Sequence, residues 1–166
     1  MHRKLLISLG LLTLFGCAST APPPLPDPCS LLGASDIPDL AGTQKSVKTS
    51  GDETVAQCYF RVREESRSVT LEITRASSQA ATRALWEKQF EPGEREEEEK
   101  GKREVHGVEV HGLGEDAMWT GNRVSGALYV RTTNTILRIS IGGTGTSEEK
   151  LERAKLLARK AIQRLE

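Results

Sequence analysis

The alternation of apolar and polar residues along this chain predicts five strands. Over Ser68–Arg75 the apolar residues Val69, Leu71 and Ile73 alternate with polar ones, which is the period-two pattern of a strand that buries one face. Related patterns predict further strands over Val55–Glu64, Ala117–Thr120, Ala127–Thr132 and Thr135–Ile141. The first of these places Cys58, Phe60 and Val62 on one face.

Two segments have the spacing of amphipathic helices. Ser78–Phe90 contains the pair Trp86 and Phe90, four residues apart, and a Pro-Gly pair follows it. Ser147–Leu165 repeats apolar residues at positions 151, 154, 158, 161 and 165, which mark one buried face. Acidic residues begin this helix and basic residues end it, as the helix dipole favours.

The order of these elements predicts the fold class. In each half of the chain, strands are followed by a helix, and residues 29–42 suggest one or two short helical turns broken at Pro38. We therefore expect a single α+β domain over residues 29–166. It would be an antiparallel β-sheet covered by helices, with two roughly similar strand-strand-strand-helix halves. The halves share too little identity to claim a duplication.

The N-terminus has the pattern of a targeting segment. Residues 1–4 are cationic, and residues 5–15 are an apolar run too short to cross a bilayer as a helix. Leu14-Phe15-Gly16-Cys17 resembles the lipobox of bacterial lipoproteins, although Phe15 is larger than the usual residue there. The resemblance implies a signal peptide over 1–16 and a lipid on Cys17. The alternative is an ordinary secretory signal, cut near Ala18–Ala21.

A lipid on Cys17 would determine the location of the protein. Two or more acyl chains hold a protein stably on a membrane, so we expect an exported protein anchored to the lipid bilayer through acylated Cys17. By the same resemblance, Ala18 favours the outer membrane if the organism has one, and otherwise the outer face of the cell membrane. Residues 18–28 contain five prolines, so residues 17–28 form an extended tether.

The cysteine count predicts a disulfide. The chain has three cysteines, and lipid on Cys17 leaves Cys29 and Cys58 as a pair in an oxidising compartment. The alternatives are two free thiols or half a metal site. No CxxC or CxxH spacing supports a metal, so we expect none.

Charge argues against nucleic acid as a partner. The whole chain has net charge 0, and removing residues 1–16 deletes Arg3 and Lys4, which leaves about −2. An acidic run followed by a basic one spans Glu94–Arg103. It could gather divalent cations, but consecutive carboxylates point several ways at once, so we interpret it as a solvated connection.

Two further segments could carry chemistry. Gly142–Ser147 lies between a strand and a helix, where phosphate can bind, but it lacks both nucleotide fingerprints. Thr146 and Glu149 match a capping box instead. His106 and His111 could serve a zinc site or a general base, yet residues five apart on a strand face opposite sides. We interpret both histidines as structural or exposed.

The chain contains none of the motifs Gly-x-Ser-x-Gly, Ser-x-x-Lys or HExxH, so we expect no enzyme and no cofactor. Trp86 and Trp119 are candidate binding-surface residues, with burial in the core as the alternative. The expected function is a non-catalytic binding or protein-interaction domain whose partner is another envelope protein. A carrier of a small apolar ligand is the alternative, and an envelope hydrolase is the weaker one.

Three segments carry a resemblance to a family. They are Asp27–Leu32, Cys58-Tyr59-Phe60 and Gly112–Trp119. With the strands and helix that end the chain, they resemble small actinobacterial-type lipoproteins of unknown function, whose mature domain opens Pro-Cys-x-Leu-Leu. The resemblance implies an α+β domain with a Cys29–Cys58 bridge and no established activity. The acidic run at 94–99 departs from the family pattern.

Overall fold

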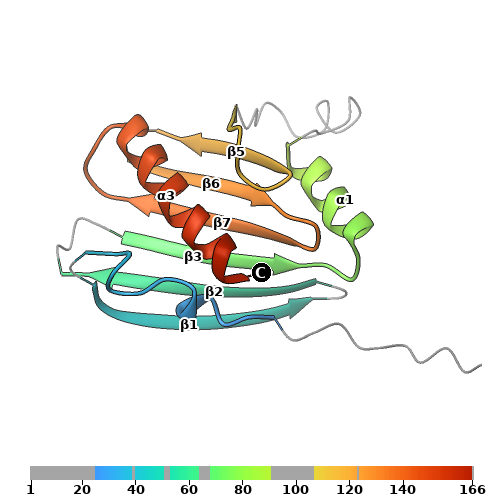
Figure 1. The fold of residues 1–166 in the computed structure, drawn as a ribbon, viewed down its shortest axis with the longest axis horizontal. Coiled ribbons are helices and arrows are strands. Elements are labelled where there is room, and N and C mark those ends of the chain that lie inside the picture. Colours follow the sequence, from blue (N-terminus) through green and yellow to red (C-terminus); the bar gives the residue numbers. More distant parts are fainter. Residues whose placement is uncertain are drawn as a thin grey trace, which may run out of the picture.

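The computed structural model describes residues 25–38, 40–50, 53–63, 68–90, 107–122 and 124–165. Several predicted features lie outside these residues: the signal peptide at 1–16, Cys17, most of the tether, His106 and the run Glu94–Arg103. The described residues form a seven-stranded antiparallel sheet and two α-helices (Figure 1). The expected α+β class, with an antiparallel sheet and helices, is confirmed.

The strands occupy the sheet in the order β1-β2-β3-β7-β6-β5-β4. Their bounds are β1 Leu40–Ser50, β2 Glu53–Val62, β3 Ser68–Arg75, β4 Val108–Glu109, β5 Asp116–Gly121, β6 Ser125–Arg131 and β7 Thr135–Gly142. The α-helices are α1, Gln79–Phe90, and α3, Ser147–Leu165, and a short 3-10 turn, η1, covers Pro28–Ser30. Strand β3 pairs with β7, and this pairing joins the first half of the chain to the second half in one sheet.

The strongest periodic patterns gave the most accurate bounds. Strand β3 and helix α3 match the predicted ranges at both ends, and β7 differs by one residue. Strand β1 was not predicted. It lies at the edge of the sheet, and residues 43–48 are all exposed, so they show no alternation of apolar and polar residues.

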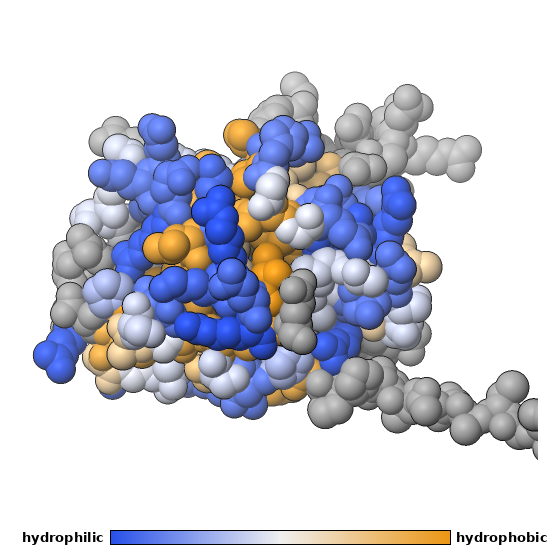
Figure 2. All heavy atoms as spheres, in the orientation of Figure 1, coloured by the Kyte–Doolittle hydropathy of each residue, from blue (hydrophilic) through white to orange (hydrophobic). Residues whose placement is uncertain are grey.

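One face of the sheet, the covered face, packs under α3, which crosses the sheet in Figure 1. Inward-facing residues of β2, β3, β6 and β7 form its core, including Phe60, Leu71, Leu128 and Ile139, all 0 % exposed. The side chains that α3 buries against them are mostly small, namely Ala154, Ala158 and Ala161 with Leu157. Small side chains let the helix lie close to the strands. In Figure 2 the outer side of α3 is mostly hydrophilic.

The opposite face, the open face, carries the alternate residues of the same strands. Tyr129 and Arg138 belong to it, because their neighbours in sequence point into the core. Helix α1 packs on this side: its Phe90 ring meets the Tyr129 ring edge-on, with centroids 5.0 Å apart. Of the described elements, α1 covers only part of the open face, and Tyr59 of β2 is 40 % exposed.

The N-terminal segment completes the covered face. Leu31, Leu32 and Ile37 are at most 3 % exposed and belong to the core, and Leu25 packs against it. Leu25 therefore packs on the domain although it lies within the predicted tether, residues 17–28. Neither helix in the described ranges has the length and apolar character to span a membrane.

Candidate functional site

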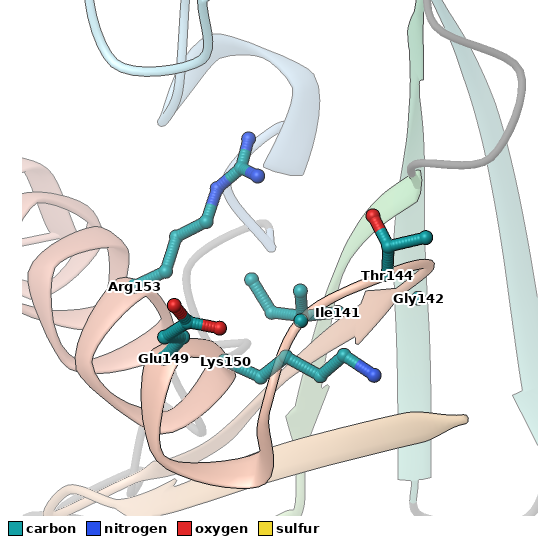
Figure 3. A pocket seen from close by; sticks show the side chains of 7 residues that line it. Ile141, Gly142, Thr144, Glu149, Lys150 and Arg153 are labelled. Carbon is teal, nitrogen blue, oxygen red and sulfur yellow. The ribbon is translucent and has the colours of Figure 1, made fainter. Parts of the chain in front are cut away.

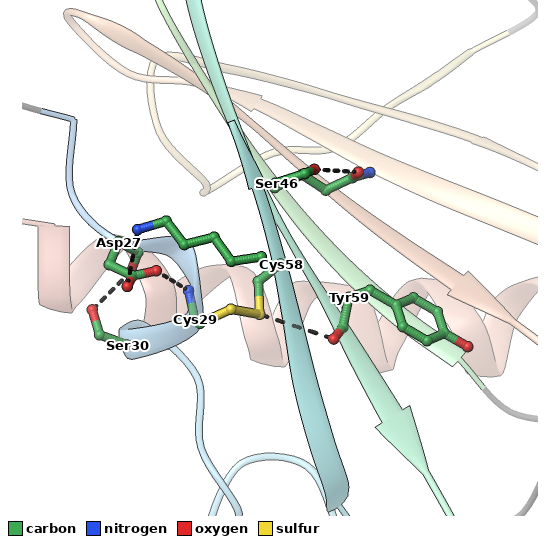
Figure 4. The surroundings of a disulfide bond; sticks show 8 residues. Asp27, Cys29, Ser30, Ser46, Cys58 and Tyr59 are labelled. Atoms are coloured by element: carbon green, nitrogen blue, oxygen red, sulfur yellow. Dashed lines mark hydrogen bonds and ion pairs between the residues drawn. A yellow bond between two sulfur atoms is a disulfide. The ribbon is translucent and has the colours of Figure 1, made fainter. Parts of the chain in front are cut away.

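The predicted disulfide between Cys29 and Cys58 is confirmed, with the two Cα atoms 5.1 Å apart (Figure 4). It attaches the η1 turn to β2, and Cys58 is completely buried. The turn is also capped, because the Asp27 carboxylate accepts a hydrogen bond from the Cys29 backbone N–H at 2.9 Å. That bond, followed by the Lys45 ammonium 3.1 Å away, lowers the pKa of Asp27. The bridge and the cap fix the point where the chain enters the domain.

A buried carboxylate joins this N-terminal segment to α3. The Asp36 side chain is 2 % exposed and accepts hydrogen bonds from Arg164, from Lys160 Nζ at 2.8 Å and from the Gly33 backbone N–H at 2.9 Å. The hydrogen bond from Arg164, with further help from Lys160, holds the pKa of Asp36 well below its usual range. This ion cluster is structural, because its members satisfy one another.

Trp86 and Trp119, the candidate binding-surface residues, are both 4 % exposed. The Trp119 ring lies in the core, and its Nε1 donates to the Ser147 hydroxyl at the start of α3, at 3.2 Å. Trp86 stacks at a tilt on Phe90 of the same helix, with centroids 4.5 Å apart. Both rings are therefore packed inside the protein.

The loop before α3 borders a hollow of about 280 Å³ (Figure 3). Glu149, Lys150 and Arg153 extend around it from the first turns of the helix, and Thr144 lines it from the loop. Thr146 and Glu149 form the expected capping box: the Glu149 carboxylate accepts from the Thr146 N–H at 2.7 Å, and the Thr146 hydroxyl accepts from the Glu149 N–H at 3.1 Å. A carboxylate therefore occupies the position that a phosphate would need.

The Gly112–Trp119 segment forms a turn that encloses an arginine. Gly112 and Gly114 have φ of 78° and 57°, values that favour glycine. The two residues that follow, Glu115 and Asp116, both form ion pairs with Arg131, whose side chain is 8 % exposed. The segment thus satisfies the charge of one arginine on the open face.

His111 is exposed and has a carboxylate as its neighbour. Its Nδ1 lies 3.5 Å from the Glu109 carboxylate, and its side chain is 84 % exposed. A hydrolase would need a serine, a histidine and a carboxylate within hydrogen-bonding distance of one another. Among the described residues, His111 forms no hydrogen bond with a serine. Among the described residues, no group of three or more His, Cys, Asp or Glu side chains could hold a metal ion.

The open face brings Arg138 of β7 and Tyr129 of β6 together. Arg138 Nε donates to the Tyr129 hydroxyl at 3.0 Å, and its guanidinium carbon lies 5.6 Å from the centre of the Tyr129 ring. Unlike Arg131, Arg138 forms no ion pair with a carboxylate in the part of the chain that the structure describes. A half-buried arginine without a carboxylate is the most distinctive chemical feature of this face.

Two hollows adjoin this Tyr129–Arg138 pair. One, of about 160 Å³, lies between the sheet and the α1 residues Leu85 and Gln89, and Glu72 also lines it. The other, of about 330 Å³, lies over β5, β6 and β7, where Ser140 and small residues line it. Arg138 therefore stands between two surface recesses, which makes this part of the open face the candidate binding site.

The comparisons with protein-family models, curated proteins and solved structures found no match to this chain. Sequence reasoning did not identify Arg138 as a site residue, because a polar residue in a half-buried strand ordinarily faces solvent. The available signal was its position within Thr-Ile-Leu-Arg-Ile-Ser-Ile, the most apolar strand of the chain.

Proposed function

We propose that this protein is an exported lipoprotein, anchored through Cys17, whose folded domain is a non-catalytic binding module. The binding surface of the proposed module is the open face of the sheet around Tyr129 and Arg138. The lipobox pattern supports the anchor. The separate resemblance of residues 27–166 to small lipoproteins of unknown function supports a small envelope domain with no established activity. The bridge at Cys29 is compatible with both, because disulfides persist in exported proteins.

The observation that carries the proposal is the contrast between two arginines on one face. Glu115 and Asp116 neutralise Arg131, whereas Arg138 forms no ion pair among the described residues, not even with Glu72, its cross-strand partner on β3. Its Nε donates to the Tyr129 hydroxyl, and its guanidinium lies over the Tyr129 ring. A guanidinium that the domain leaves without a counter-charge is available to one from a ligand or partner. The hollows on both sides provide space for such a group.

The proposal extends to the two halves of the chain. Strands β1, β2 and β3 run from one edge to the centre of the sheet, and β5, β6 and β7 run to the centre from the other side. We propose that the likeness of the halves extends to this strand order only. Among the described elements, the helices that follow contact the same strands, β6 and β7, from opposite faces, and α1 leaves Tyr59 on the open face of β2 exposed.

Surface binding is better supported than an apolar carrier. A carrier needs an enclosed apolar cavity between sheet and helix. Here Phe60, Leu71 and Leu128 in the core of the covered face are 0 % exposed. Arg138 lines both hollows of the candidate site. A polar recess of this kind suits a charged ligand or the polar surface of another envelope protein.

The anchor is tested by the Cys17→Ser variant, expressed in a bacterium that processes lipoproteins. The unaltered chain should fractionate with membranes and label with a radioactive fatty acid, and the variant should do neither. Unchanged fractionation of the variant would contradict the anchor.

The binding surface is tested by photo-crosslinking in intact envelopes. A photoreactive amino acid at Tyr59, 40 % exposed on the open face, should give adducts, and one at Leu156, 51 % exposed on α3, should not. Both are large exposed side chains, and they differ in the face that they report. Equal yields from both would contradict the open face as the binding surface.

A further inference from the structure

We infer that the hollow over β5, β6 and β7 binds a small anionic molecule through its carboxylate or phosphate group, with Arg138 and Ser140 as the donors. This inference rests on the proposed function and specifies the class of ligand. It concerns a site on the open face, distinct from the recess beside α3.

The floor of the hollow is low because Ala127 has a small side chain on the open face. Gly121 and Gly126 line the hollow with backbone only, because a Cβ at either would point at the Trp119 ring on the covered face. The resulting space is about 330 Å³, enough for a small metabolite. Asn122 and Ser125 lie at its exposed rim.

Arg138 is held in place while its binding atoms remain available. The hydrogen bond from Nε to the Tyr129 hydroxyl and the ring beneath the guanidinium restrict the side chain. Among the described residues no hydrogen bond or ion pair uses its two Nη groups. These two groups form the planar fork that binds a carboxylate or a phosphate through two parallel hydrogen bonds.

Ser140 gives an independent indication of a ligand. Its hydroxyl is buried and has no hydrogen-bond partner among the described residues, although Ser140 lines the same hollow and lies two residues after Arg138 on the same face. A buried hydroxyl without a partner costs free energy, and a hydrogen bond to a bound anion would recover it. An anion held by Arg138 would accept the Ser140 hydrogen.

The charges around the hollow favour an anion. Among the described residues no Asp or Glu lines it. Glu149 lines the hollow beside α3, and Glu72, the partner of Arg138 on β3, lines the smaller one beneath α1. The lining of the hollow over β5, β6 and β7 contains one cation and several groups that can donate, including the Tyr129 hydroxyl, whose hydrogen remains free after it accepts from Arg138. Among the lining residues that the structure describes, Arg138 is the one charged group, and it would repel a cation.

The test is a titration of the full chain, isotope-labelled, with inorganic phosphate and separately with citrate, at constant ionic strength. Backbone amide resonances report the binding position. We expect saturable shifts concentrated at residues 120–127 and 138–140, with a millimolar or lower Kd for at least one probe. The tighter probe identifies whether phosphate or carboxylate is the preferred group.

Two variants separate the donors. Arg138→Gln should weaken binding about tenfold or more, as expected for loss of a charge-assisted hydrogen bond. Ser140→Ala should weaken it about threefold or more while leaving the melting temperature equal or higher, because the variant also removes the unsatisfied hydroxyl. This opposite effect on binding and stability is not expected of a serine with a purely structural role.

Arg61→Gln is the matched control, since it removes one positive charge from the same face, beside a different hollow. It should change the Kd less than twofold. Shifts that do not saturate, or equal loss in Arg61→Gln and Arg138→Gln, would mean general attraction by charge and overturn the inference. Binding unaffected by both Arg138→Gln and Ser140→Ala would overturn it too.

The outcome is separable from that of the proposed function. Crosslinking at Tyr59 and membrane fractionation do not depend on phosphate or citrate. If those experiments succeed and neither probe binds the hollow, the binding module stands and the small-anion ligand is rejected.

Discussion

Asp36 and Arg164 form a hydrogen-bonded ion pair although they are 128 residues apart in the chain. Arg164 Nη1 donates to one carboxylate oxygen at 2.6 Å and Nη2 to the other at 3.2 Å. The same Nη1 donates to the Leu31 carbonyl at 2.6 Å. The last turn of α3 is thereby attached to the segment that follows the proposed membrane tether, so both ends of the domain depend on one carboxylate.

The first prediction concerns this carboxylate. Asp36→Asn keeps the shape of the side chain but removes the charge that Lys160 and Arg164 neutralise. Because both cations are partly exposed and can be solvated, we expect a loss of about 1–3 kcal/mol in the free energy of unfolding. Urea denaturation measures it.

Glu152→Gln is the control for that variant. It removes the carboxylate of an ion pair with Lys155 on the same helix, at a position 63 % exposed. Surface ion pairs of this kind contribute little to stability, so Glu152→Gln should change the free energy of unfolding by less than about 0.5 kcal/mol. An Asp36→Asn variant no less stable than Glu152→Gln would refute the role assigned to the cluster.

The second prediction is the pH dependence of that difference. The hydrogen bonds from Arg164 and Lys160 lower the pKa of folded Asp36. In the unfolded chain the pKa is about 3.9. A lowered folded-state pKa stabilises the protein fully above the unfolded value, and this contribution is lost as the pH falls towards the folded value.

The gap in stability between the unaltered chain and Asp36→Asn should therefore be constant above about pH 5 and should narrow below about pH 4. Urea midpoints measured for both chains across this range provide the check. Asp27 is present in both chains, so its contribution to the pH dependence cancels in the difference between them. If the difference in stability between the two chains instead grows as the pH falls, the pKa of folded Asp36 is not lowered, and its assigned charge is wrong.

The third prediction concerns the Cys29–Cys58 bridge. It closes a loop with a sequence separation of 29, so on the chain-entropy model its loss should cost about 3–4 kcal/mol. Cys29→Ala/Cys58→Ala should show this loss under oxidising conditions and should not respond to dithiothreitol. The unaltered chain should fall to the same stability when reduced. Alkylation of both cysteines without a reductant would contradict the bridge.

The sequence predicts most accurately those elements that have a regular spacing of apolar residues. The bounds of β3 and α3 follow from alternation and from helical spacing, because each of these elements buries one face. The disulfide followed from a count of cysteines. Strand β1 was not predicted, because an edge strand exposed along most of its length has no buried face and therefore no alternation of apolar and polar residues.

The candidate site could not be predicted in the same way. The contact between Arg138 and Tyr129 depends on the register of β6 against β7, in which these two residues are partners. Whether an arginine has a counter-charge is also decided by the fold: Glu115 and Asp116 lie opposite Arg131 only because the turn at Gly114 returns the chain there. Sequence alone treats the two arginines alike.

The fourth prediction concerns Gly126 and the Trp119 ring. A Cβ atom at Gly126 would lie 2.1 Å from Trp119 Cη2 and 2.2 Å from Cζ2. The ring is 4 % exposed and hydrogen-bonded to Ser147, so it can retreat only by disturbing the start of α3. Gly126→Ala should therefore cost about 1–3 kcal/mol, the usual penalty for overpacking a core.

Gly33→Ala is the matched control, because a Cβ there meets nothing within 4 Å. It should change stability by less than about 0.5 kcal/mol. Thermal unfolding compares the two variants, and near-ultraviolet circular dichroism reports the packing of Trp119 directly. If Gly126→Ala has the same melting temperature as Gly33→Ala and leaves the tryptophan signal unchanged, the ring is not fixed between the β5–β6 hairpin and α3. If only Gly126→Ala is destabilised, with an altered tryptophan signal, the glycine is required because the indole occupies the space of a side chain.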